Sequence, residues 1–500
     1  MSKEIIINIS YETMLVFLVL SIITLPRIWL EIKHPLCCGW DIPYYPAQLH
    51  NYNIKLSPDE PLFFLLSSLL KPIFGVFLSV KILHIVLFIL FSITFFILIK
   101  RYFDFKVALI TLLILGFLPA LTRIWADQYR NFLAFSLFPL FILLFLDDRK
   151  WYWLASGFVL GLIGLSHRMV FVFSIFTMFI FFLFKRKLDR FKKCLVVVII
   201  GILLAFPYYY KEYLGPAFVR GEEEYKPKEA LIKQREILLA WKEPPSVKVP
   251  LDLSSFLIIP ALGVLFATLC KEKSKIEELL LSIFIVGLLF GLGFFGTPFL
   301  IYFRYQCSLA FFTIFVFPIF LDRLFKEYKE RNTLYKLIYL LILIAFLIPP
   351  LYFGFKFLQV QTPLVNTCVF NTLIENREMI SKKDIALLVT SRLHRWIEAL
   401  IPEKKSGKDL FVAEWYCLTG DFPRSDPRCG PDLIFNGRID ESIEEYKKLK
   451  EKGNFTKLYL IFDPAMEPIN MGLINQKIFA GILECINYPC LHLCLFNYSD

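Results

Sequence analysis

Long apolar runs dominate this chain and limit what it can fold into. Hydrophobic residues make up 57% of its 500 residues and include 54 Phe. A helix of about 20 predominantly apolar residues matches the thickness of a lipid bilayer, and roughly eleven such windows follow one another. Their approximate cores are 12–30, 76–99, 106–121, 128–146, 151–166, 168–184, 194–210, 251–270, 278–299, 303–321 and 334–355. The pattern predicts an α-helical polytopic membrane protein with about 11 transmembrane helices.

A further apolar segment, Leu62–Phe74, is too short to cross a bilayer. Lys71-Pro72 interrupt it, and proline in a helix interior removes a hydrogen bond. We therefore expect a re-entrant or interfacial helix at this point.

The net charge of +11 does not indicate nucleic acid as a partner, because the basic residues form short clusters between the apolar runs. Such clusters face the cytoplasm in membrane proteins. They are Lys100-Arg101, Arg149-Lys150, Lys185-Arg186-Lys187, Lys271–Lys275 and Arg323–Arg331. The other loops are poor in positive charge. The chain is thus predicted to lie in the cell (plasma) membrane with its N-terminus in the cytoplasm and its C-terminal region outside.

The composition changes near Gln359, which predicts a transmembrane domain over 1–358 and an extracytoplasmic domain over 359–500. Strand-like runs at Asp384–Thr390, Asp409–Trp415 and Lys457–Phe462 alternate there with helical patterns. The helical patterns cover Ser391–Ile401 and Asp440–Lys450. This alternation predicts a small α/β domain.

Cysteines gather in this C-terminal region, among them Cys417, Cys429, Cys485, Cys490 and Cys494. An extracytoplasmic location permits disulfides, and Cys417–Cys429 is one pairing that the sequence allows. Zinc binding is the alternative, although none of these spacings is Cys-x-x-Cys.

The first outer loop carries the leading candidate for catalysis, Asp41, which lies close to Trp40, Tyr44 and Tyr45. A carboxylate at the membrane surface can act as a general base for an acceptor hydroxyl. Aromatic rings suit both the membrane interface and stacking on sugar faces. The alternative is that Asp41 caps a helix while the aromatic residues form an interfacial belt.

A second outer loop contains Arg123, Asp127 and Arg130. Asp127 and Arg130 are three residues apart, so on one helix they would share a face and could pair. Guanidinium groups suit phosphate oxygens, so both arginines are candidates to bind a lipid phosphate. An ion pair that closes the loop is the alternative.

His167, Arg168 and Arg304 are the remaining candidates. His167 and Arg168 separate two spans with almost no loop, and ionisable residues at membrane depth usually face a cavity or the protein interior. A hydrogen-bonded structural histidine is the alternative for His167. Arg304 begins a late span, where it could stabilise a leaving phosphate or extend to the interface.

These elements resemble the GT-C superfamily of glycosyltransferases, closest to its protein O-mannosyltransferase and aminoarabinose-transferase branch. The resemblance is carried by Gly39-Trp40-Asp41-Ile42-Pro43-Tyr44-Tyr45-Pro46-Ala47-Gln48-Leu49 and Pro58-Asp59-Glu60-Pro61-Leu62-Phe63-Phe64. It implies that Asp41 lies at the catalytic centre and that Asp59 and Glu60 help to build the same cavity. It extends more loosely over Arg123–Asn131 and Leu165–Arg168, but not over the C-terminal region.

Two departures bear on metal dependence. Asp41 stands alone where the family often has two adjacent acidic residues, and the WWDYG sequence of the oligosaccharyltransferases is absent. A clear DxD motif in the second outer loop is absent as well. The resemblance therefore favours a reaction without a metal or other cofactor, and the sequence stays compatible with a divalent cation.

The sequence and the resemblance together predict a lipid-phosphate-sugar-dependent glycosyltransferase of the hexosyltransferase class. Its donor would be a polyprenyl- or dolichyl-phosphate sugar, and its acceptor a protein, lipid or glycan at the outer membrane face. The alternative function is a lipid or glycan transporter or flippase. Transporters tend to show repeated halves and charges near mid-membrane, and the sequence shows no internal repeat.

Overall fold

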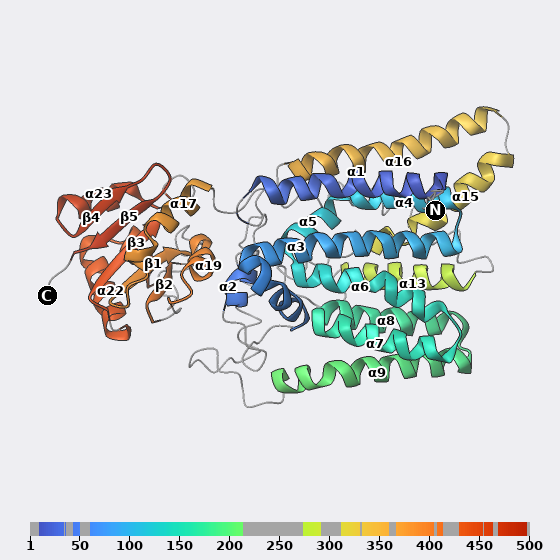
Figure 1. The fold of residues 1–500 in the computed structure, drawn as a ribbon, viewed down its shortest axis with the longest axis horizontal. Helices are drawn as coiled ribbons and strands as arrows, with labels where there is room; N and C mark the ends of the chain where they lie inside the picture. Colours follow the sequence, from blue (N-terminus) through green and yellow to red (C-terminus); the bar gives the residue numbers. More distant parts are fainter. Residues whose placement is uncertain are drawn as a thin grey trace, which may run out of the picture. The chain divides into compact units, whose positions relative to one another are not determined.

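The computed structural model describes most of the chain in two compact units. The described residues are 10–34, 36, 44–50, 61–213, 274–291, 312–330, 333–359, 367–404, 408–413, 430–453, 455–463 and 469–497. The first unit, the membrane unit, holds the long apolar helices (Figure 1). The second, the C-terminal unit, combines Thr362–Asp500 with His34–Tyr52 of the predicted first outer loop.

Helices account for the regular structure of the membrane unit in the described residues. They are α1 (Tyr11–Lys33), α3 (Leu62–Tyr102), α4 (Phe105–Gly116), α5 (Pro119–Asp127), α6 (Tyr129–Leu146), α7 (Lys150–Ser166), α8 (Arg168–Lys185), α9 (Leu188–Tyr213), α13 (Lys275–Gly291), α15 (Phe317–Glu330) and α16 (Thr333–Gln359). The predicted polytopic helical fold is therefore confirmed.

Six helices in the described part of the chain are long and apolar enough to cross a membrane, or seven if the bent pair α4–α5 is one span. The predicted span at 251–270 lies outside the described residues, as does much of 303–321. α7 and α13 have 17 described helical residues each. The count of about 11 spans is not confirmed and stays a prediction.

A break at Gly75 divides α3 into a short first part and a long second part. Gly75 has φ 72° and ψ 177°, a backbone conformation that residues with a Cβ rarely adopt. The short helix expected at Leu62–Phe74 is the first part of α3. The interruption lies at Gly75 rather than at Lys71-Pro72, because Pro72 is accommodated within the helical run.

Glycines allow α7 and α9 to pack closely. A Cβ added at Gly157 would lie 2.7 Å from Ile200 Cβ, and one at Gly161 would lie 2.6 Å from Leu204 Cβ. Gly201 of α9 faces Leu160 in the same way. Small residues at helix contacts are a common device in membranes, where close van der Waals packing drives helix association.

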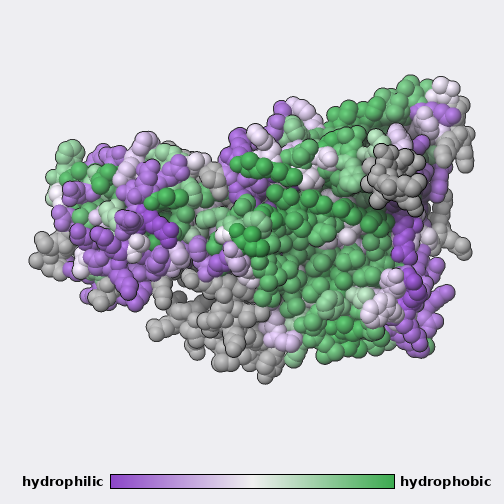
Figure 2. Space-filling view, viewed as in Figure 1, coloured by the Kyte–Doolittle hydropathy of each residue, from purple (hydrophilic) through white to green (hydrophobic). Residues whose placement is uncertain are grey.

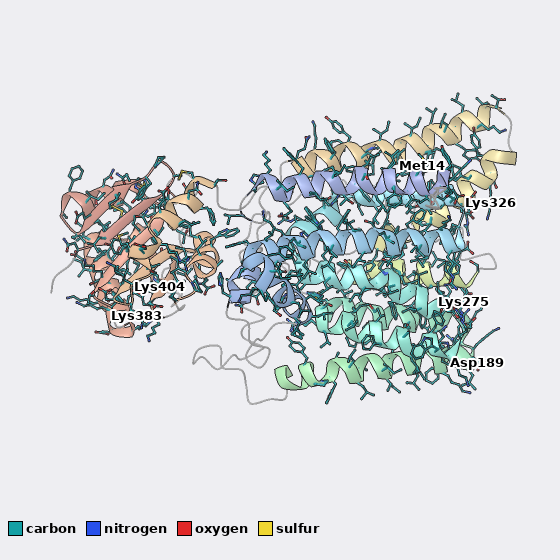
Figure 3. The ribbon with its side chains drawn as sticks, viewed as in Figure 1. Met14, Asp189, Lys275, Lys326, Lys383 and Lys404 are labelled. Atoms are coloured by element: carbon teal, nitrogen blue, oxygen red, sulfur yellow. A yellow bond between two sulfur atoms is a disulfide. The ribbon has the colours of Figure 1, made fainter. Side chains whose placement is uncertain are left out.

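The basic loops collect at one end of the membrane unit. Figure 2 shows apolar surface along the side of the helical bundle and polar surface at the end where Figure 3 labels Asp189, Lys275 and Lys326. Asp147, between α6 and α7, accepts hydrogen bonds from Arg149 and Arg101. The bonds from Arg149 are the main reason that the pKa of Asp147 lies well below its usual value.

Further ion pairs at this end, here called the basic end, join neighbouring helices. Asp148 pairs with Lys193 and with Lys275, and Glu278 of α13 pairs with Arg190 at 2.7 Å. The clustering agrees with the charge pattern of the loops. Which side of the membrane this end faces stays a prediction.

The C-terminal unit contains the predicted small α/β domain, built on a five-stranded sheet of order β2-β1-β3-β5-β4. β1 pairs in parallel with β2 and β3, whereas β5 pairs antiparallel with β3 and β4. The strands are β1 (Ile385–Thr390), β2 (Leu410–Ala413), β3 (Lys457–Phe462), β4 (Leu483–Asn487) and β5 (His492–Phe496). The first three match the predicted strands to within two residues, whereas β4 and β5 were not predicted.

The helices of this unit pack around the sheet and include two that the sequence predicted, α19 and α22. They are α2 (Tyr44–His50), α17 (Thr367–Glu375), α18 (Arg377–Ile380), α19 (Ser391–Leu400), α21 (Asp432–Asn436), α22 (Ile439–Lys452) and α23 (Met471–Phe479). Tyr446, Phe455 and Phe496 pack together in the domain core.

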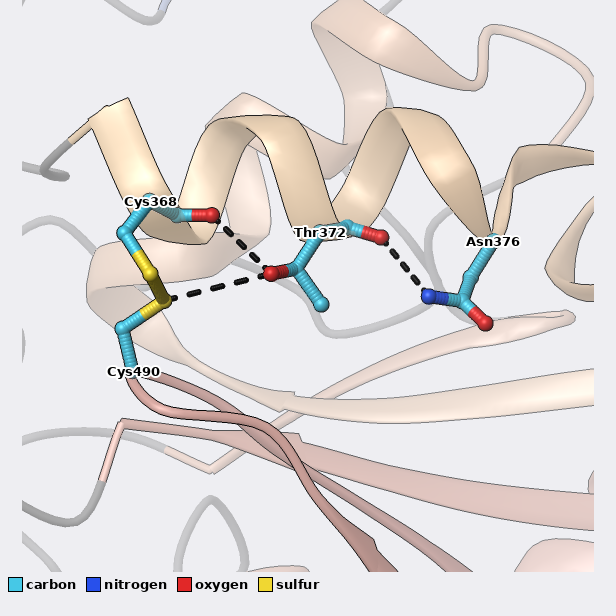
Figure 4. The surroundings of a disulfide bond; sticks show 4 residues. All are labelled: Cys368, Thr372, Asn376 and Cys490. Atoms are coloured by element: carbon cyan, nitrogen blue, oxygen red, sulfur yellow. Dashed lines mark hydrogen bonds between the residues drawn. A yellow bond between two sulfur atoms is a disulfide. The ribbon is translucent and has the colours of Figure 1, made fainter.

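Two disulfides stabilise this domain in its described part, Cys368–Cys490 and Cys485–Cys494. The first joins α17 to the hairpin of β4 and β5, where the Thr372 hydroxyl donates to the Cys368 carbonyl and lies 3.9 Å from Cys490 Sγ (Figure 4). Cys368 is not among the five cysteines considered from the sequence alone. The suggested pairing Cys417–Cys429 lies outside the described residues.

Candidate functional site

The structure describes only some of the predicted site residues. Asp41, Asp59, Glu60 and Arg304 lie outside the described residues. Tyr44 and Tyr45 form the start of α2, with their rings in an edge-to-face contact at 5.6 Å. The other candidates, Arg123, Asp127, Arg130, His167 and Arg168, lie in the membrane unit.

Arg123 and Asp127 lie on α5, a short helix that follows a 55° bend after α4. Arg123 is buried, while the Asp127 side chain is outside the described atoms. Gln128 interrupts the helix with φ −128° and ψ 65°, so Arg130 belongs to α6. The expected common helix face for Asp127 and Arg130 is therefore wrong, because the two residues lie on different helices.

A buried group of ionisable side chains, here called the polar cluster, lies within the apolar helices α1 and α3. It consists of Arg27, Glu31, Lys81 and His84, none of which is more than 6% exposed. Lys81 Nζ lies 3.6 Å from Glu31 Oε2 and donates to the Glu31 carbonyl at 2.6 Å. His84 Nδ1 lies 3.8 Å from Glu31 Oε1. The Glu31 carboxylate of α1 thus lies close to both Lys81 and His84 of α3.

Arg27 links α1 to the bend between α4 and α5. Its Nη2 donates to the Gly116 carbonyl at the end of α4 (2.7 Å) and to Thr122 Oγ1 of α5 (3.1 Å). A cation suits this position, because carbonyl groups at a helix C-terminus lack intrahelical partners and carry partial negative charge. Arg27 therefore stabilises the 55° bend between α4 and α5.

Aromatic rings cover the polar cluster. His84 stacks on Trp125 of α5 with a centroid distance of 4.4 Å, and the Tyr129 ring of α6 lies 3.9 Å from His84. The Arg27 guanidinium lies 4.0 Å from the Phe88 ring centroid, within cation–π range. These contacts connect α1 and α3 to the helices that carry Arg123 and Arg130.

The polar cluster lies far from the basic end. Glu31 is near the last residue of α1, and Met14, near its first, is labelled at the basic end in Figure 3. At about 1.5 Å of rise per residue, the two are roughly 25 Å apart. Because α1 joins the first outer loop at this end, the polar cluster lies at the predicted outer face.

The polar cluster could have been predicted from the ionisable residues within the apolar spans. Ionisable residues inside apolar spans are costly and usually functional. Lys81 and His84 interrupt the span predicted at 76–99, while Arg27 and Glu31 are close to the end of the first span. The predicted site residues lie in or beside loops, and none of these four residues is among them.

His167 and Arg168 lie at the junction of α7 and α8. His167 is buried and extended (φ −164°), and its amide donates to the Ile163 carbonyl at 2.9 Å. Arg168 begins α8 and is exposed. The loop 147–149 at the basic end joins the last residue of α6 to the first residue of α7. The start of α6, with Arg130, and the end of α7, next to His167 and Arg168, therefore both lie toward the opposite end of the bundle.

Metal ligands do not come together in the described part of the chain, where no group of three or more His, Cys, Asp or Glu side chains could hold a metal ion. Of the acidic residues of the predicted site, Asp41, Asp59 and Glu60 lie outside that part, and so does the side chain of Asp127. The structure therefore leaves a divalent cation compatible with the site.

Comparisons with known proteins point to one fold. A family model described as dolichyl-phosphate-mannose-protein mannosyltransferase matches residues 57–210. The oligosaccharyltransferase of Archaeoglobus fulgidus, in complex with zinc and sulfate, superposes with a TM-score of 0.58. It is 16% identical, and the match covers 88% of this chain and 67% of that one. The protein has the GT-C glycosyltransferase fold.

Two further solved structures are similar to this chain. The apo form of the same oligosaccharyltransferase gives a TM-score of 0.55 at 15% identity, covering 90% of this chain and 69% of that one. ArnT from Cupriavidus metallidurans bound to undecaprenyl phosphate gives a TM-score of 0.49 at 10% identity over 97% of this chain and 99% of that one. None of the curated proteins matches the chain by sequence.

The family match confirms the predicted GT-C resemblance over part of the chain. Residues 57–210 include Asp59, Glu60, Arg123 and His167, together with Lys81 and His84 of the polar cluster. Asp41, Arg304 and the C-terminal domain lie outside the matched range.

Proposed function

We propose that the protein is a hexosyltransferase that moves a sugar from a polyprenyl-phosphate carrier to an acceptor hydroxyl at the outer face of the cell membrane. The observation that carries the proposal is the mannosyltransferase family match over residues 57–210, on a chain with the GT-C fold. The name of that family supplies the donor class, a sugar on a polyprenol-type lipid phosphate. The acceptor is a protein, lipid or glycan.

Asp41 is the proposed general base. It takes the proton of the acceptor hydroxyl, whose oxygen forms a bond to the anomeric carbon of the sugar. The bond between that carbon and the phosphate oxygen breaks, and the lipid phosphate leaves with the electron pair. Tyr44 and Tyr45 are proposed to stack on the sugar, while Asp59 and Glu60 line the same cavity.

The leaving phosphate needs positive charge nearby, because negative charge develops on it as the bond breaks. This charge is proposed to come from Arg123, Arg130 and Arg304. Their guanidinium groups would donate paired hydrogen bonds to the phosphate oxygens. His167 and Arg168 are proposed to orient the polyprenyl-phosphate sugar. The burial of Arg123 supports this assignment, because interactions with charge are stronger in a site shielded from water.

The polar cluster adds support for a site at this end of the bundle. Arg27, Glu31 and Lys81 together hold two cations and one carboxylate in an apolar surrounding. Their net positive charge favours an anion nearby, which suits a lipid phosphate that approaches from the membrane. The same end carries Arg123 on α5.

The test is a transfer assay with the full chain in proteoliposomes and a panel of radiolabelled polyprenyl-phosphate sugars, with and without a chelator. We expect at least one donor to lose its sugar to an acceptor and to release polyprenyl phosphate. Arg123→Met should raise the donor KM, whereas the matched variant Arg149→Met at the basic end should leave it unchanged. Movement of intact donor between leaflets without sugar transfer would contradict the proposal and favour a flippase.

A further inference from the structure

Helix α5 is a short element whose orientation depends on its contacts with other helices. It has 9 residues, and the helical backbone is interrupted at both of its ends, at Leu118 (ψ 118°) and at Gln128 (ψ 65°). Neither α4 nor α6 therefore fixes the rotation of α5 about its own axis. Helices shorter than about 12 residues are marginal when isolated. The side-chain contacts of α5 thus decide the direction in which its residue Arg123 points.

The Arg27 guanidinium bridges the bend between α4 and α5. Its Nη2 donates to the carbonyl of Gly116, the last residue of α4, at 2.7 Å and to Thr122 Oγ1 of α5 at 3.1 Å. Its Nη1 donates to the Ile23 carbonyl in its own helix at 2.6 Å. A guanidinium is planar and its donors have fixed directions. Once it is bonded to α1, it therefore fixes both the end of α4 and one side chain of α5.

Gly116 allows α1 to come this close to the end of α4. A Cβ added at Gly116 would lie 2.6 Å from Ile23 Cβ, closer than real side chains approach. Arg27 is four residues after Ile23, so the two side chains lie on the same face of α1. The absence of a side chain at Gly116 thus brings the carbonyl at the end of α4 within reach of Arg27.

A second contact of Arg27 lies on the same face of α5. Trp125 is three residues after Thr122, so the two share a helix face, and the Arg27 guanidinium lies 5.2 Å from the Trp125 ring centroid. Arg123 directly follows Thr122, and successive residues of a helix are rotated by about 100°. With Thr122 and Trp125 held against Arg27, the side of α5 that presents Arg123 is fixed.

We propose that Arg27 is a positioning residue for the lipid phosphate, because its bond to Thr122 fixes the rotation of α5 and thereby directs the Arg123 guanidinium. The inference rests on the proposed function for the role of Arg123 as a phosphate ligand. Arg27 itself is 1% exposed and its Nη2 is bonded to protein oxygens, so it acts through α5. Loss of the bond leaves α5 free to rotate, and the affinity for the phosphate falls.

Conservative substitutions separate this positioning from the effect of charge alone. Thr122→Val keeps the shape of the side chain and removes the acceptor, whereas Thr122→Ser keeps the hydroxyl. Arg27→Lys keeps the positive charge and removes the planar set of donors. If Arg27 acted only through its charge, Thr122→Val and Arg27→Lys would bind the phosphate as the wild type does.

The experiment measures the binding of radiolabelled polyprenyl phosphate, without a sugar, to the full chain, together with hydrogen exchange of residues 119–127. Thr111→Val is the matched control, because Thr111 is as buried as Thr122 but its hydroxyl donates to the Val107 carbonyl within α4. The other variants are Thr122→Val, Thr122→Ser, Arg27→Lys, Arg123→Met and the double variant Thr122→Val/Arg123→Met.

We expect Thr122→Val and Arg27→Lys to raise exchange at 119–127 and to raise the Kd for polyprenyl phosphate about tenfold, since a hydrogen bond to a charged group is lost. Thr122→Ser and Thr111→Val should stay within about twofold of the wild type. The double variant should bind no more weakly than Arg123→Met alone, because Thr122 acts through Arg123.

Three results would overturn the inference. The first is a wild-type Kd in Thr122→Val, and the second is a wild-type Kd in Arg123→Met. The third is a double variant in which the two losses of affinity add. None of these measurements requires sugar transfer. If the expected pattern of binding is found but the wild type transfers no sugar from any donor, the proposed function fails and the positioning of Arg123 by Arg27 stands.

Discussion

The imidazole ring of His84 stacks on the indole ring of Trp125, with centroids 4.4 Å apart and ring planes inclined by 18°. This contact joins the second part of α3 to α5, the short helix that carries Arg123. His84 Nδ1 also lies 3.8 Å from the Glu31 carboxylate of α1. A buried ionisable group thus supports the helix that presents a proposed phosphate-binding arginine.

Substitution of His84 tests whether this stacking positions α5. His84→Phe keeps a ring against Trp125, whereas His84→Leu removes it. An aromatic pair contributes about 0.5–1.5 kcal/mol, so we expect His84→Leu to lower kcat/KM for the donor by up to about tenfold relative to His84→Phe. Steady-state transfer assays check this. Equal loss in both variants would show that the contact with Glu31, and not the stacking, is what matters.

Close packing of α7 on α9 predicts a strong effect at Gly161. A Cβ there would lie 2.6 Å from Leu204 Cβ, so Gly161→Val must push the two helices apart. Overpacking of this kind costs about 1–3 kcal/mol. Thermal unfolding in detergent should show a lower midpoint, while Phe158→Leu, at an exposed position on α7, should leave it unchanged. A normal midpoint for Gly161→Val would contradict the close approach of these helices.

The two described disulfides should differ in their contribution to stability. The cysteines of the pair Cys368–Cys490 are 122 positions apart in the sequence, whereas those of the pair Cys485–Cys494 are only 9 positions apart. In the chain-entropy model, these lengths correspond to about 5 and about 2.7 kcal/mol. Replacing both cysteines of a pair by Ala should therefore destabilise the C-terminal domain more for the first pair. Denaturant unfolding, followed by hydrogen exchange in β3, measures the two losses of stability. A larger loss on removal of Cys485–Cys494 would contradict the chain-entropy model.

His492 makes the stability of the C-terminal domain sensitive to acid. Partial burial against Phe462 lowers the pKa of His492 from its ordinary value, an effect that the charge of Asp463 opposes. A lowered pKa means that the unfolded chain binds the proton first as the pH falls. The contribution of neutral His492 is therefore complete above about pH 6.5 and is lost as the pH falls through the folded pKa.

His492→Gln should remove this part of the acid sensitivity. Unfolding midpoints of the domain at pH 7.5 and pH 5 provide the measurement, and the difference between them should be smaller in the variant than in the wild type. An identical difference in both proteins would mean that His492 does not titrate differently on folding.

The sequence predicted those parts of the fold that depend on local patterns. Long apolar runs located the helices, and short strand-like runs located β1, β2 and β3, because hydrophobic patterning is a property of neighbouring residues. The short β4 was missed, since the apolar Cys485 and Ile486 follow each other and give no simple alternation of apolar and polar residues, although Ile486 is exposed.

Contacts between distant segments could not be predicted in this way. The pairing of Glu31 with Lys81, and the packing of α2 on α19, join residues that are far apart in the chain. The helical conformation of Pro119–Asp127 was also missed, because the polar residues between the two predicted spans are typical of a loop. The sequence thus identified Arg123 and Arg130 as candidates but not the residues that hold α5 in place.

Asp41→Asn, assayed in the full chain with the donor that the wild type uses, tests the central proposal most directly. The change keeps the size of the side chain and removes its ability to accept a proton. A general base contributes about 100-fold to 10,000-fold, so we predict that transfer falls at least 100-fold in a normally inserted variant. Transfer at the wild-type rate by Asp41→Asn would contradict the assignment of Asp41 as the base and move the catalytic centre elsewhere.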